Sequence, residues 1–226
     1  MDLENLKQQA AELAVEFIHS GMVIGLGTGS TVYYALLKLG QRVREGLDIV
    51  GIPTSVQTAE IAKKQGIPLS DLSCHSKLDL TIDGADEIDV NLNLIKGLGG
   101  ALVREKITAE ASERLIIIAD QSKIVAYLGQ NTPLPVEVMM FGWKVTQNRI
   151  NQLCTRAERR YEKMEAYMTD NGNYILDCYF DQITHAAKME AKINNLPGVV
   201  ENGLFTNRVE MAIIATEDGI EIFVID

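Results

Sequence analysis

The sequence predicts an α/β protein in which a Rossmann-like parallel-sheet domain carries a smaller ferredoxin-like α+β lid domain. Up to about residue 123, short apolar runs alternate with amphipathic helical stretches, an order typical of a parallel sheet with helices on both faces. From residue 133 the order becomes strand, helix, hairpin, helix, strand, which is that of a split βαβ unit. The 226 residues, 46% of them hydrophobic, are enough to bury a core in each domain. The change of pattern places residues 1–130 and 206–226 in the larger domain and 131–205 in the smaller one.

The first expected element is a helix over residues 3–18. Leu6, Ala10 and Leu13 recur at helical spacing, and Gly21 supplies a left-handed cap beyond the helix end. His19 then lies in the last turn, where a histidine interacts favourably with the helix dipole. We therefore expect a structural role for His19.

Strands and helices then alternate along the first half of the chain. Each expected strand is a short apolar run, and the helices open at polar or glycine-rich turns. In chain order these elements are a strand at 22–27, a loop and helix at 28–43, a strand at 47–55, a helix at 56–66, and strands at 78–86 and 114–120.

The second half predicts the smaller domain and a returning tail. Its expected elements are a strand at 133–138, a helix at 143–156, a hairpin at 163–180, a helix at 183–196 and a strand at 199–205. The hairpin turns at Asn171–Gly172, the residue pair that most strongly favours a tight turn. Residues 209–226 contain two strand runs joined at 217–219, and we expect them to return to the larger domain.

Charge and cysteine content exclude several classes of partner. The formal net charge of −10 provides no global field for nucleic acid or for an anionic membrane surface. Cys74, Cys154 and Cys178 have neither paired nor metal-like spacing, which fits a reducing cytoplasm and argues against a zinc site. Apolar runs such as 115–119 fall far short of the ~20 residues that a membrane span needs.

The stretch "GLGTGST", Gly25–Thr31, is a candidate phosphate-binding loop between a strand and a helix. Its glycines permit a sharp turn that aims backbone N–H groups and a helix N-terminus at an anion, and Thr28, Ser30 and Thr31 add hydroxyls. A dinucleotide site would need glycine at position 30 and an acidic residue after the next strand, and a Walker loop would need Gly-Lys-Ser/Thr. Neither pattern is present. From the residues alone, a tight turn with hydroxyl caps explains the stretch equally well.

The stretch "DLTIDGADEID", residues 79–89, places five carboxylates where a strand ends. For Glu87 and Asp89 we accept a polar turn with capping side chains. Asp83 and Asp86 differ, because ligands of parallel-sheet proteins bind outside the carboxyl ends of the strands. We expect these two carboxylates to be functional.

A second glycine-rich loop, "KGLGGALVREK" at 96–106, opens an expected helix. It brings Lys96, three glycines and a glutamate, Glu105, into a short span, and Arg104 and Lys106 flank the glutamate. Glycines allow a ligand to approach closely, and neighbouring cations can hold a carboxylate in a defined ionisation state. We therefore favour a functional loop over a solvated helix start.

In this order and spacing, the three stretches resemble the A-type ribose-5-phosphate isomerases. The same resemblance extends to "IADQSK" at 118–123, "PLPVEV" at 133–138, "TDNGN" at 169–173 and "LPGVVENGLF" at 196–205. It implies an enzyme that interconverts ribose 5-phosphate and ribulose 5-phosphate in the non-oxidative pentose phosphate pathway without a metal or another cofactor. It also implies a cytoplasmic homodimer, with the small domain as a contact surface.

The resemblance implies roles for individual residues. Glu105 is the general base, and Asp83, Asp86 and Lys96 are further catalytic residues. The implied substrate-binding residues are Thr28, Gly29, Ser30, Thr31, Asp83, Gly84, Ala85, Asp86, Lys96, Gly97, Leu98, Gly99 and Lys123. The family usually has three consecutive glycines after the lysine, whereas Leu98 interrupts them here. Lys7 is a weaker phosphate candidate, for which a solvated helix face is the favoured interpretation.

These residue types suit aldose–ketose isomerisation through an enediol. A carboxylate such as Glu105 can move a proton between C1 and C2. Lys96 and loop N–H groups can stabilise the oxyanion, an effect often worth ~3 kcal/mol per donor. Asp83 is the candidate for ring opening and for moving protons between the oxygens, and Asp86 for orienting a hydroxyl or Lys96.

Two other functions remain open. A coenzyme A transferase of similar fold uses a glutamate after glycines as a covalent nucleophile. A sugar-phosphate sensor would use the same scaffold for binding without turnover, although such sensors generally carry a DNA-binding domain, and neither a helix-turn-helix extension nor a basic patch is found. The histidines, His19, His75 and His185, lie outside the three loops, so a histidine-based or metal-dependent isomerase is not indicated.

Overall fold

The structure, a computed structural model, describes residues 3–224, which form two compact units. Within the described residues, the first unit comprises 3–85, 104–123 and 208–224, and the second comprises 86–103 and 124–207. The sequence predicts that 86–103 and 124–130 belong to the larger domain. The structure groups them with the smaller one, because the strands in 86–103 pair with a strand from 204–205 and not with the large sheet.

A six-stranded sheet forms the centre of the first unit. Its strands are β1 (Val23–Leu26), β2 (Val50–Pro53), β3 (Leu80–Asp83), β6 (Leu115–Asp120), β14 (Met211–Thr216) and β15 (Gly219–Val224), in the order β15-β14-β6-β3-β1-β2. All neighbours are parallel except β14 and β15, which form an antiparallel hairpin. The pairing of β14 with β6 confirms that the C-terminal tail returns to the parallel sheet.

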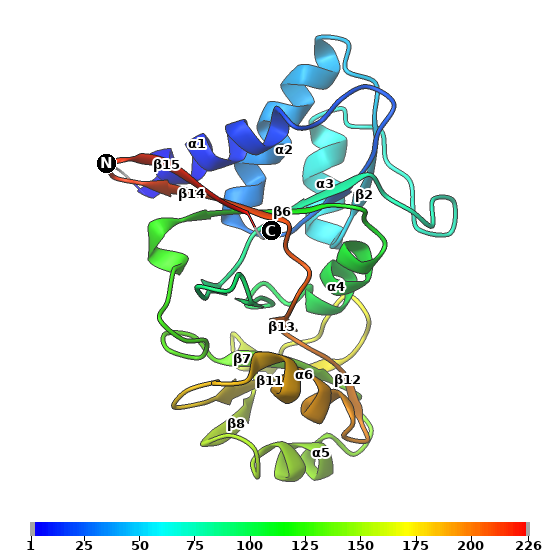
Figure 1. Ribbon diagram of the computed structural model, residues 1–226. Coiled ribbons are helices and arrows are strands. Elements are labelled where there is room, and N and C mark those ends of the chain that lie inside the picture. The colour runs from blue at the N-terminus through cyan, green and yellow to red at the C-terminus, as the bar shows by residue number, and fades with distance from the viewer. Residues whose placement is uncertain (1–2, 225–226) are drawn as a thin grey trace. The chain divides into compact units, whose positions relative to one another are not determined.

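Helices cover both faces of this sheet, as the sequence predicts. Figure 1 shows α1 (Leu3–Val15), α2 (Ser30–Arg44) and α3 (Val56–Lys64) grouped together, in blue to cyan. Ile24 and Leu26 of β1 point into their shared apolar core. Gly25 lies between them and therefore faces the other side. There a Cβ atom would lie 2.6 Å from Thr108 of α4 (Leu102–Glu110), which covers that face.

The first helix is shorter than expected. It ends at Val15, and the N–H groups of residues 16, 17 and 18 donate to carbonyls three residues earlier, over 3.1–3.2 Å. This tighter turn leaves His19 outside the helix, so the prediction that His19 lies in its last turn was wrong. Gly21 has the expected left-handed conformation, with a φ of +93°.

The second unit is built on a four-stranded antiparallel sheet of the predicted ferredoxin-like topology. Its strands are β7 (Leu134–Val138), β8 (Arg156–Arg159), β11 (Tyr174–Tyr179) and β12 (Val199–Asn202), in the order β12-β7-β11-β8. By chain position these are the fourth, first, third and second strands of the βαββαβ order. Ile150 of α5 (Trp143–Ile150) and Ile193 of α6 (Ala186–Asn194) are buried in one core with these strands.

Two elements of the second unit differ from expectation. Helix α5 ends at Ile150 and not at 156, because Arg156 begins β8 and pairs with Tyr179 of β11. Strand β11 therefore pairs with β7 and β8, and the segment at 163–168 meets it only through a single bridge between Met168 and Tyr174. The residues between β8 and β11 form a small ribbon of β9 (Tyr161–Glu162) and β10 (Glu165–Ala166).

A three-stranded sheet in the second unit was not predicted. It consists of β4 (Glu87–Ile88), β5 (Leu94–Ile95) and β13 (Leu204–Phe205). Two-residue strands are too short to show any periodicity in sequence.

Glu87 and Asp89 differ from each other in the structure. Glu87 is 0% exposed, and its carboxylate accepts N–H groups from residues 129, 131 and 132 over 2.6–2.8 Å. The interpretation of Glu87 as part of a polar turn was wrong, because it holds a loop some forty residues away. Asp89 does cap a turn, accepting the N–H groups of Asn91 and Asn93.

No helix within residues 3–224 has both the length and the apolar character that a membrane crossing requires. The three cysteines, Cys74, Cys154 and Cys178, are all free.

Candidate active site

The first-unit site residues lie at the point where the strand order reverses. Strand β1 pairs with β2 on one side and with β3 on the other, so the chain leaves β1 in one direction and then crosses back to β3. In open parallel sheets, ligands bind beyond the carboxyl ends of the strands at such a point. The loop after β1 and the loop after β3 meet there, since Thr28 N–H donates to Asp83 Oδ1 over 3.1 Å.

Two glycines of the first loop are required by its geometry. A Cβ atom on Gly27 would lie 2.6 Å from the Cα atom of Asp83, so no side chain fits. Gly29 has φ +130° and ψ 173°, a conformation that is essentially restricted to glycine. Gly29 precedes α2, and among the described residues no side chain caps that helix end. The first N–H groups of α2 therefore suit an anion.

The hydroxyl of Thr28 is used inside the fold. Its Oγ1 atom lies within hydrogen-bonding distance of the hydroxyls of Thr54, Ser55 and Thr58, at 2.8, 2.9 and 3.0 Å. Thr58 in turn donates to the carbonyl of Gly27 over 2.8 Å. This cluster was not predicted from the sequence. Ser55 before a helical stretch is nevertheless a visible N-cap signal, and the Ser55 hydroxyl does accept the N–H of Thr58.

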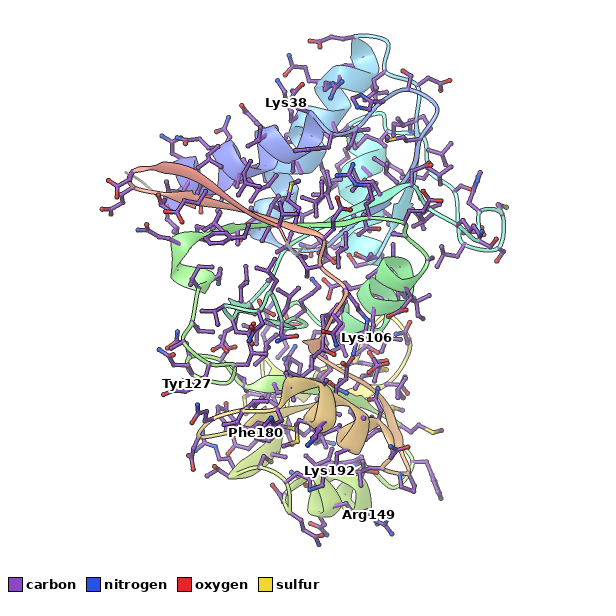
Figure 2. The ribbon with its side chains drawn as sticks, in the orientation of Figure 1. Lys38, Lys106, Tyr127, Arg149, Phe180 and Lys192 are labelled. Carbon is purple, nitrogen blue, oxygen red and sulfur yellow. The ribbon has the colours of Figure 1, made fainter. Side chains whose placement is uncertain are left out.

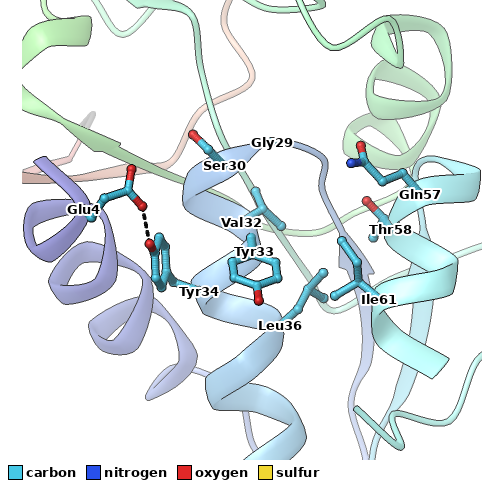
Figure 3. A pocket seen from close by; sticks show the side chains of 10 residues that line it. All are labelled: Glu4, Gly29, Ser30, Val32, Tyr33, Tyr34, Leu36, Gln57, Thr58 and Ile61. Carbon is cyan, nitrogen blue, oxygen red and sulfur yellow. Dashed lines mark hydrogen bonds between the residues drawn. The ribbon is translucent and has the colours of Figure 1, made fainter. Parts of the chain in front are cut away.

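A cavity of about 400 Å³ opens beside this loop (Figure 3). Gly29 and Ser30 line it at the start of α2, and Gln57 and Thr58 line it from α3. At its edge the Tyr34 hydroxyl donates to the carboxylate of Glu4.

Lys7 contacts the same carboxylate. The Lys7 Nζ atom lies 3.1 Å from Glu4 Oε1. The hydrogen bonds from Tyr34 and then Lys7 hold the pKa of Glu4 below its usual value. The Lys7 side chain is only 12% exposed, so the favoured interpretation that it belongs to a solvated helix face does not fit. Lys7 instead pairs, one helical turn away, with Glu4, which lines the cavity.

Asp83 is buried at the end of β3, with 1% of its surface exposed. Its Oδ1 atom accepts the N–H groups of both Thr28 and Gly84, over 3.1 and 2.8 Å. These two bonds orient the carboxylate and tie the two loops together. That clamping role was not predicted from the sequence.

Glu105 lies in the first turn of α4 and is 3% exposed. The partial positive charge of a helix N-terminus stabilises a carboxylate at this position. Lys106, labelled in Figure 2, follows it and is also buried. Lys123 ends the 3-10 helix η1 (Gln121–Lys123), which begins directly after β6.

In the second unit, Lys96 begins the other glycine-rich loop and is 2% exposed. Its Nζ atom lies 5.4 Å from the ring centroid of Phe205, a cation–π contact. Its N–H donates to the carbonyl of Gly203 over 2.9 Å. Gly203 must be a glycine, because a Cβ atom there would lie 2.2 Å from the Lys96 carbonyl oxygen.

Leu98 fits the loop without strain. Gly97 and Gly100 have φ values of +102° and +81°, whereas Leu98 is not among the residues with positive φ. Only the first and last of the loop glycines therefore need their conformational freedom. The Leu98 N–H donates to Asp86 Oδ2 over 2.9 Å, so Asp86 contacts the loop backbone.

The structure thus places the predicted residues in two groups. Thr28, Gly29, Ser30, Thr31, Asp83, Gly84, Ala85, Glu105 and Lys123 belong to the first unit, and Asp86, Lys96, Gly97, Leu98 and Gly99 belong to the second. The chain itself connects the groups at 85–86 and at 103–104. Among residues 3–224, no group of three or more His, Cys, Asp or Glu side chains could hold a metal ion.

Comparison with known proteins identifies the family. The profile of the family described as ribose 5-phosphate isomerase A (phosphoriboisomerase A) matches residues 50–219. This chain belongs to the ribose 5-phosphate isomerase A family. A member from Gloeobacter violaceus is 54% identical over 223 residues, which cover 98% of this chain and 97% of that protein. A member from Bacillus mycoides is 51% identical over 218 residues, 96% of this chain and 98% of that protein.

Solved structures of ribose 5-phosphate isomerases confirm the fold. A D-ribose-5-phosphate isomerase in complex with phospho-erythronic acid has a TM-score of 0.96 at 40% identity, covering 100% of both chains. The ribose 5-phosphate isomerase from Plasmodium falciparum has a TM-score of 0.95 at 42% identity, covering 99% of both chains.

Proposed function

We propose that this protein interconverts ribose 5-phosphate and ribulose 5-phosphate. The observation that carries the proposal is the 54% identity, over nearly the whole chain, to a protein named ribose-5-phosphate isomerase A. The first-unit contacts support it, because they build an anion-binding loop beside a fixed carboxylate.

Glu105 is the general base of the proposed mechanism. It takes the proton from C2 of the open-chain aldose and returns it to C1. The C1 carbonyl thereby becomes a hydroxyl and the C2 hydroxyl becomes a carbonyl, so no external oxidant or reductant is needed. The step requires Glu105 as a carboxylate, and its place in the first turn of α4 puts that charge beside the positive end of the helix dipole.

The remaining predicted residues hold the sugar and its developing charge. Lys96 and N–H groups of its loop stabilise the enediolate oxygen. Asp83 moves protons during ring opening and between the two oxygens, and Asp86 holds the loop through Leu98. The N-terminus of α2 over Thr28–Thr31 binds the phosphate, with Lys123 as a further cation.

The test is conversion of ribose 5-phosphate to the ketose by the purified protein, compared with the variant Glu105→Gln. We expect the variant to lose about 10³-fold in kcat with little change in KM, because general-base catalysis contributes 10²- to 10⁴-fold. Glu110→Gln is the matched control, since Glu110 ends the same helix and pairs with Arg208.

Each outcome separates the functions considered. An inactive wild-type protein would exclude an isomerase and leave the coenzyme A transferase or the sugar-phosphate sensor. An active Glu105→Gln variant would exclude Glu105 as the base while leaving the isomerase in place.

We also propose a homodimer in the cytoplasm, in contact through the second unit. An exposed apolar group in that unit supports the contact: Met139, Met140, Phe141 and Val145, of which Phe141 is 90% exposed. Large exposed apolar patches mark interaction surfaces. Light scattering coupled to gel filtration should give twice the mass of one chain, and a monomer at micromolar concentration would contradict the proposal.

A further inference from the structure

An ion pair in the second unit lies outside the residues assigned so far. Arg160 directly follows β8, and Asp177 lies on β11. The Nε atom of Arg160 donates to Asp177 Oδ2 over 2.9 Å, and its Nη2 atom donates to Oδ1. The side chains are only 12% and 17% exposed. This bidentate ion pair fixes the plane of the guanidinium group.

The third guanidinium nitrogen of Arg160 binds the glycine-rich loop. This atom, Nη1, donates to the carbonyl oxygens of Gly97 and Leu98, over 3.1 and 2.9 Å. A lysine could not bind both carbonyls and also keep a bidentate ion pair with Asp177, because only arginine presents several N–H donors in a rigid planar group.

Tyr167 holds the next carbonyl of the loop. Its hydroxyl donates to the carbonyl oxygen of Gly99 over 3.4 Å, and its ring centroid lies 5.7 Å from Arg160 Cζ. Burial raises the pKa of Tyr167, so the phenol keeps the proton that it donates. Three successive carbonyls, of residues 97, 98 and 99, are therefore held by two side chains.

Fixing these carbonyls also fixes the N–H groups of the loop. In a planar trans peptide, the N–H points away from the carbonyl of the same unit. The bonds from Arg160 to the carbonyls of Gly97 and Leu98 thus turn the N–H groups of Leu98 and Gly99 to the opposite side. The Leu98 N–H does bind Asp86 there.

We propose that Arg160, fixed by Asp177, is a positioning residue that holds the Lys96–Gly100 loop in the orientation needed to stabilise the enediolate. The inference rests on the proposed isomerase function. Arg160 acts on the loop backbone and touches no reacting atom. Its removal should therefore lower kcat, because a misplacement of about 1 Å can cost 10²-fold in rate, and should leave KM nearly unchanged.

The experiment compares Arg160→Lys with Arg156→Lys in the ribose 5-phosphate assay. Arg160→Lys keeps a cation beside Asp177, so the buried carboxylate is not left unpaired. We expect kcat to fall 10- to 100-fold, KM to change less than threefold, and the melting temperature to stay near that of the wild type. Arg156 lies on β8 with its side chain 58% exposed, so Arg156→Lys should match the wild type in all three.

A second variant, Tyr167→Phe, removes only the hydroxyl at Gly99 and should lower kcat by a smaller factor of about 3 to 10. If both Arg160→Lys and Tyr167→Phe kept the wild-type kcat, the inference would be overturned while the proposed function stood. A lower melting temperature of Arg160→Lys with an unchanged kcat would have the same consequence. A wild-type protein that forms no ketose would overturn the proposed function and this inference together.

Discussion

The two glycine-rich loops, at 25–31 and at 96–100, look alike in sequence but are held in place by different means. The first is fixed by elements that flank it in a parallel sheet, through Asp83 at the end of β3 and the hydroxyls at the start of α3. The second is held by two side chains from outside its own small sheet, Arg160 after β8 and Tyr167 after β10.

The two loops depend on different elements of the fold for their conformation. The first loop needs only the βαβ units that surround it, because its supports lie on β1, β3 and α3. The second needs β8 and β11 to be paired, since Arg160 and Asp177 come from that pair of strands. The geometry of the proposed oxyanion-binding loop thus depends on the folding of the ferredoxin-like sheet.

Gly100→Ala should have the largest effect on stability, because the added methyl group would clash with Tyr167, one of the two side chains that hold the second loop. A Cβ atom there would lie 2.0 Å from the Tyr167 hydroxyl oxygen, and φ is +81°. A left-handed alanine costs about 1–2 kcal/mol and overpacking a further 1–3, so we expect a loss of about 3 kcal/mol in urea unfolding.

Gly172→Ala is the matched control for this substitution. Its φ is +76°, and nothing lies within 4 Å of the added Cβ atom. It should cost only the conformational part, about 1–2 kcal/mol. Equal losses for the two variants would mean that Tyr167 moves aside freely, which would contradict a loop held tightly from this side.

Thr28→Val should have a smaller effect and tests the first loop. The valine removes one hydroxyl and leaves Thr54, Ser55 and Thr58 short of a partner. A hydrogen-bond partner lost in a buried site costs about 1–2 kcal/mol, so the free energy of unfolding should fall by that amount. The exposed Thr155→Val, which loses a single bond of 3.3 Å, should change it by less than 0.5 kcal/mol.

A contrasting outcome would change the interpretation of Thr28. If Thr28→Val raised KM more than tenfold while stability stayed the same, the hydroxyl would serve the substrate and not the fold. The first loop would then be less dependent on its flanking elements than the contacts indicate.

The sequence predicted the parts of the molecule whose signals are local. Alternating strands and helices gave the parallel sheet, and the βαββαβ order gave the second sheet. Glycines marked both loops, the first after a predicted strand and the second before a predicted helix. The family resemblance then assigned roles that neither periodicity nor composition contains. Helix ends were predicted less well, because the end of α5 is set by where β8 must begin in order to pair with β11.

The supports of the candidate site were not predictable in the same way. Nothing near Arg160 in sequence indicates that it contacts residues 97 and 98, because the contact arises only when β8 pairs with β11. Glu87 is a similar case. Its acidic sequence context indicates a polar turn, and only the tertiary structure shows that its carboxylate binds the loop at 129–132. Such contacts depend on tertiary pairing, which local patterns do not encode.

Leu98→Gly should have the smallest effect, and it gives four consecutive glycines, which include the three that the family usually has directly after the lysine. Leu98 does not have a positive φ, so the native loop gains nothing from a glycine there. The substitution gives the unfolded chain more freedom and should cost about 0.4–1 kcal/mol in the free energy of unfolding. Since Arg160 and Asp86 bind only the backbone of residue 98, kcat should stay within twofold of the wild type. A rise of more than threefold in kcat would mean that the leucine side chain constrains the loop, and that the backbone contacts alone do not define its active geometry.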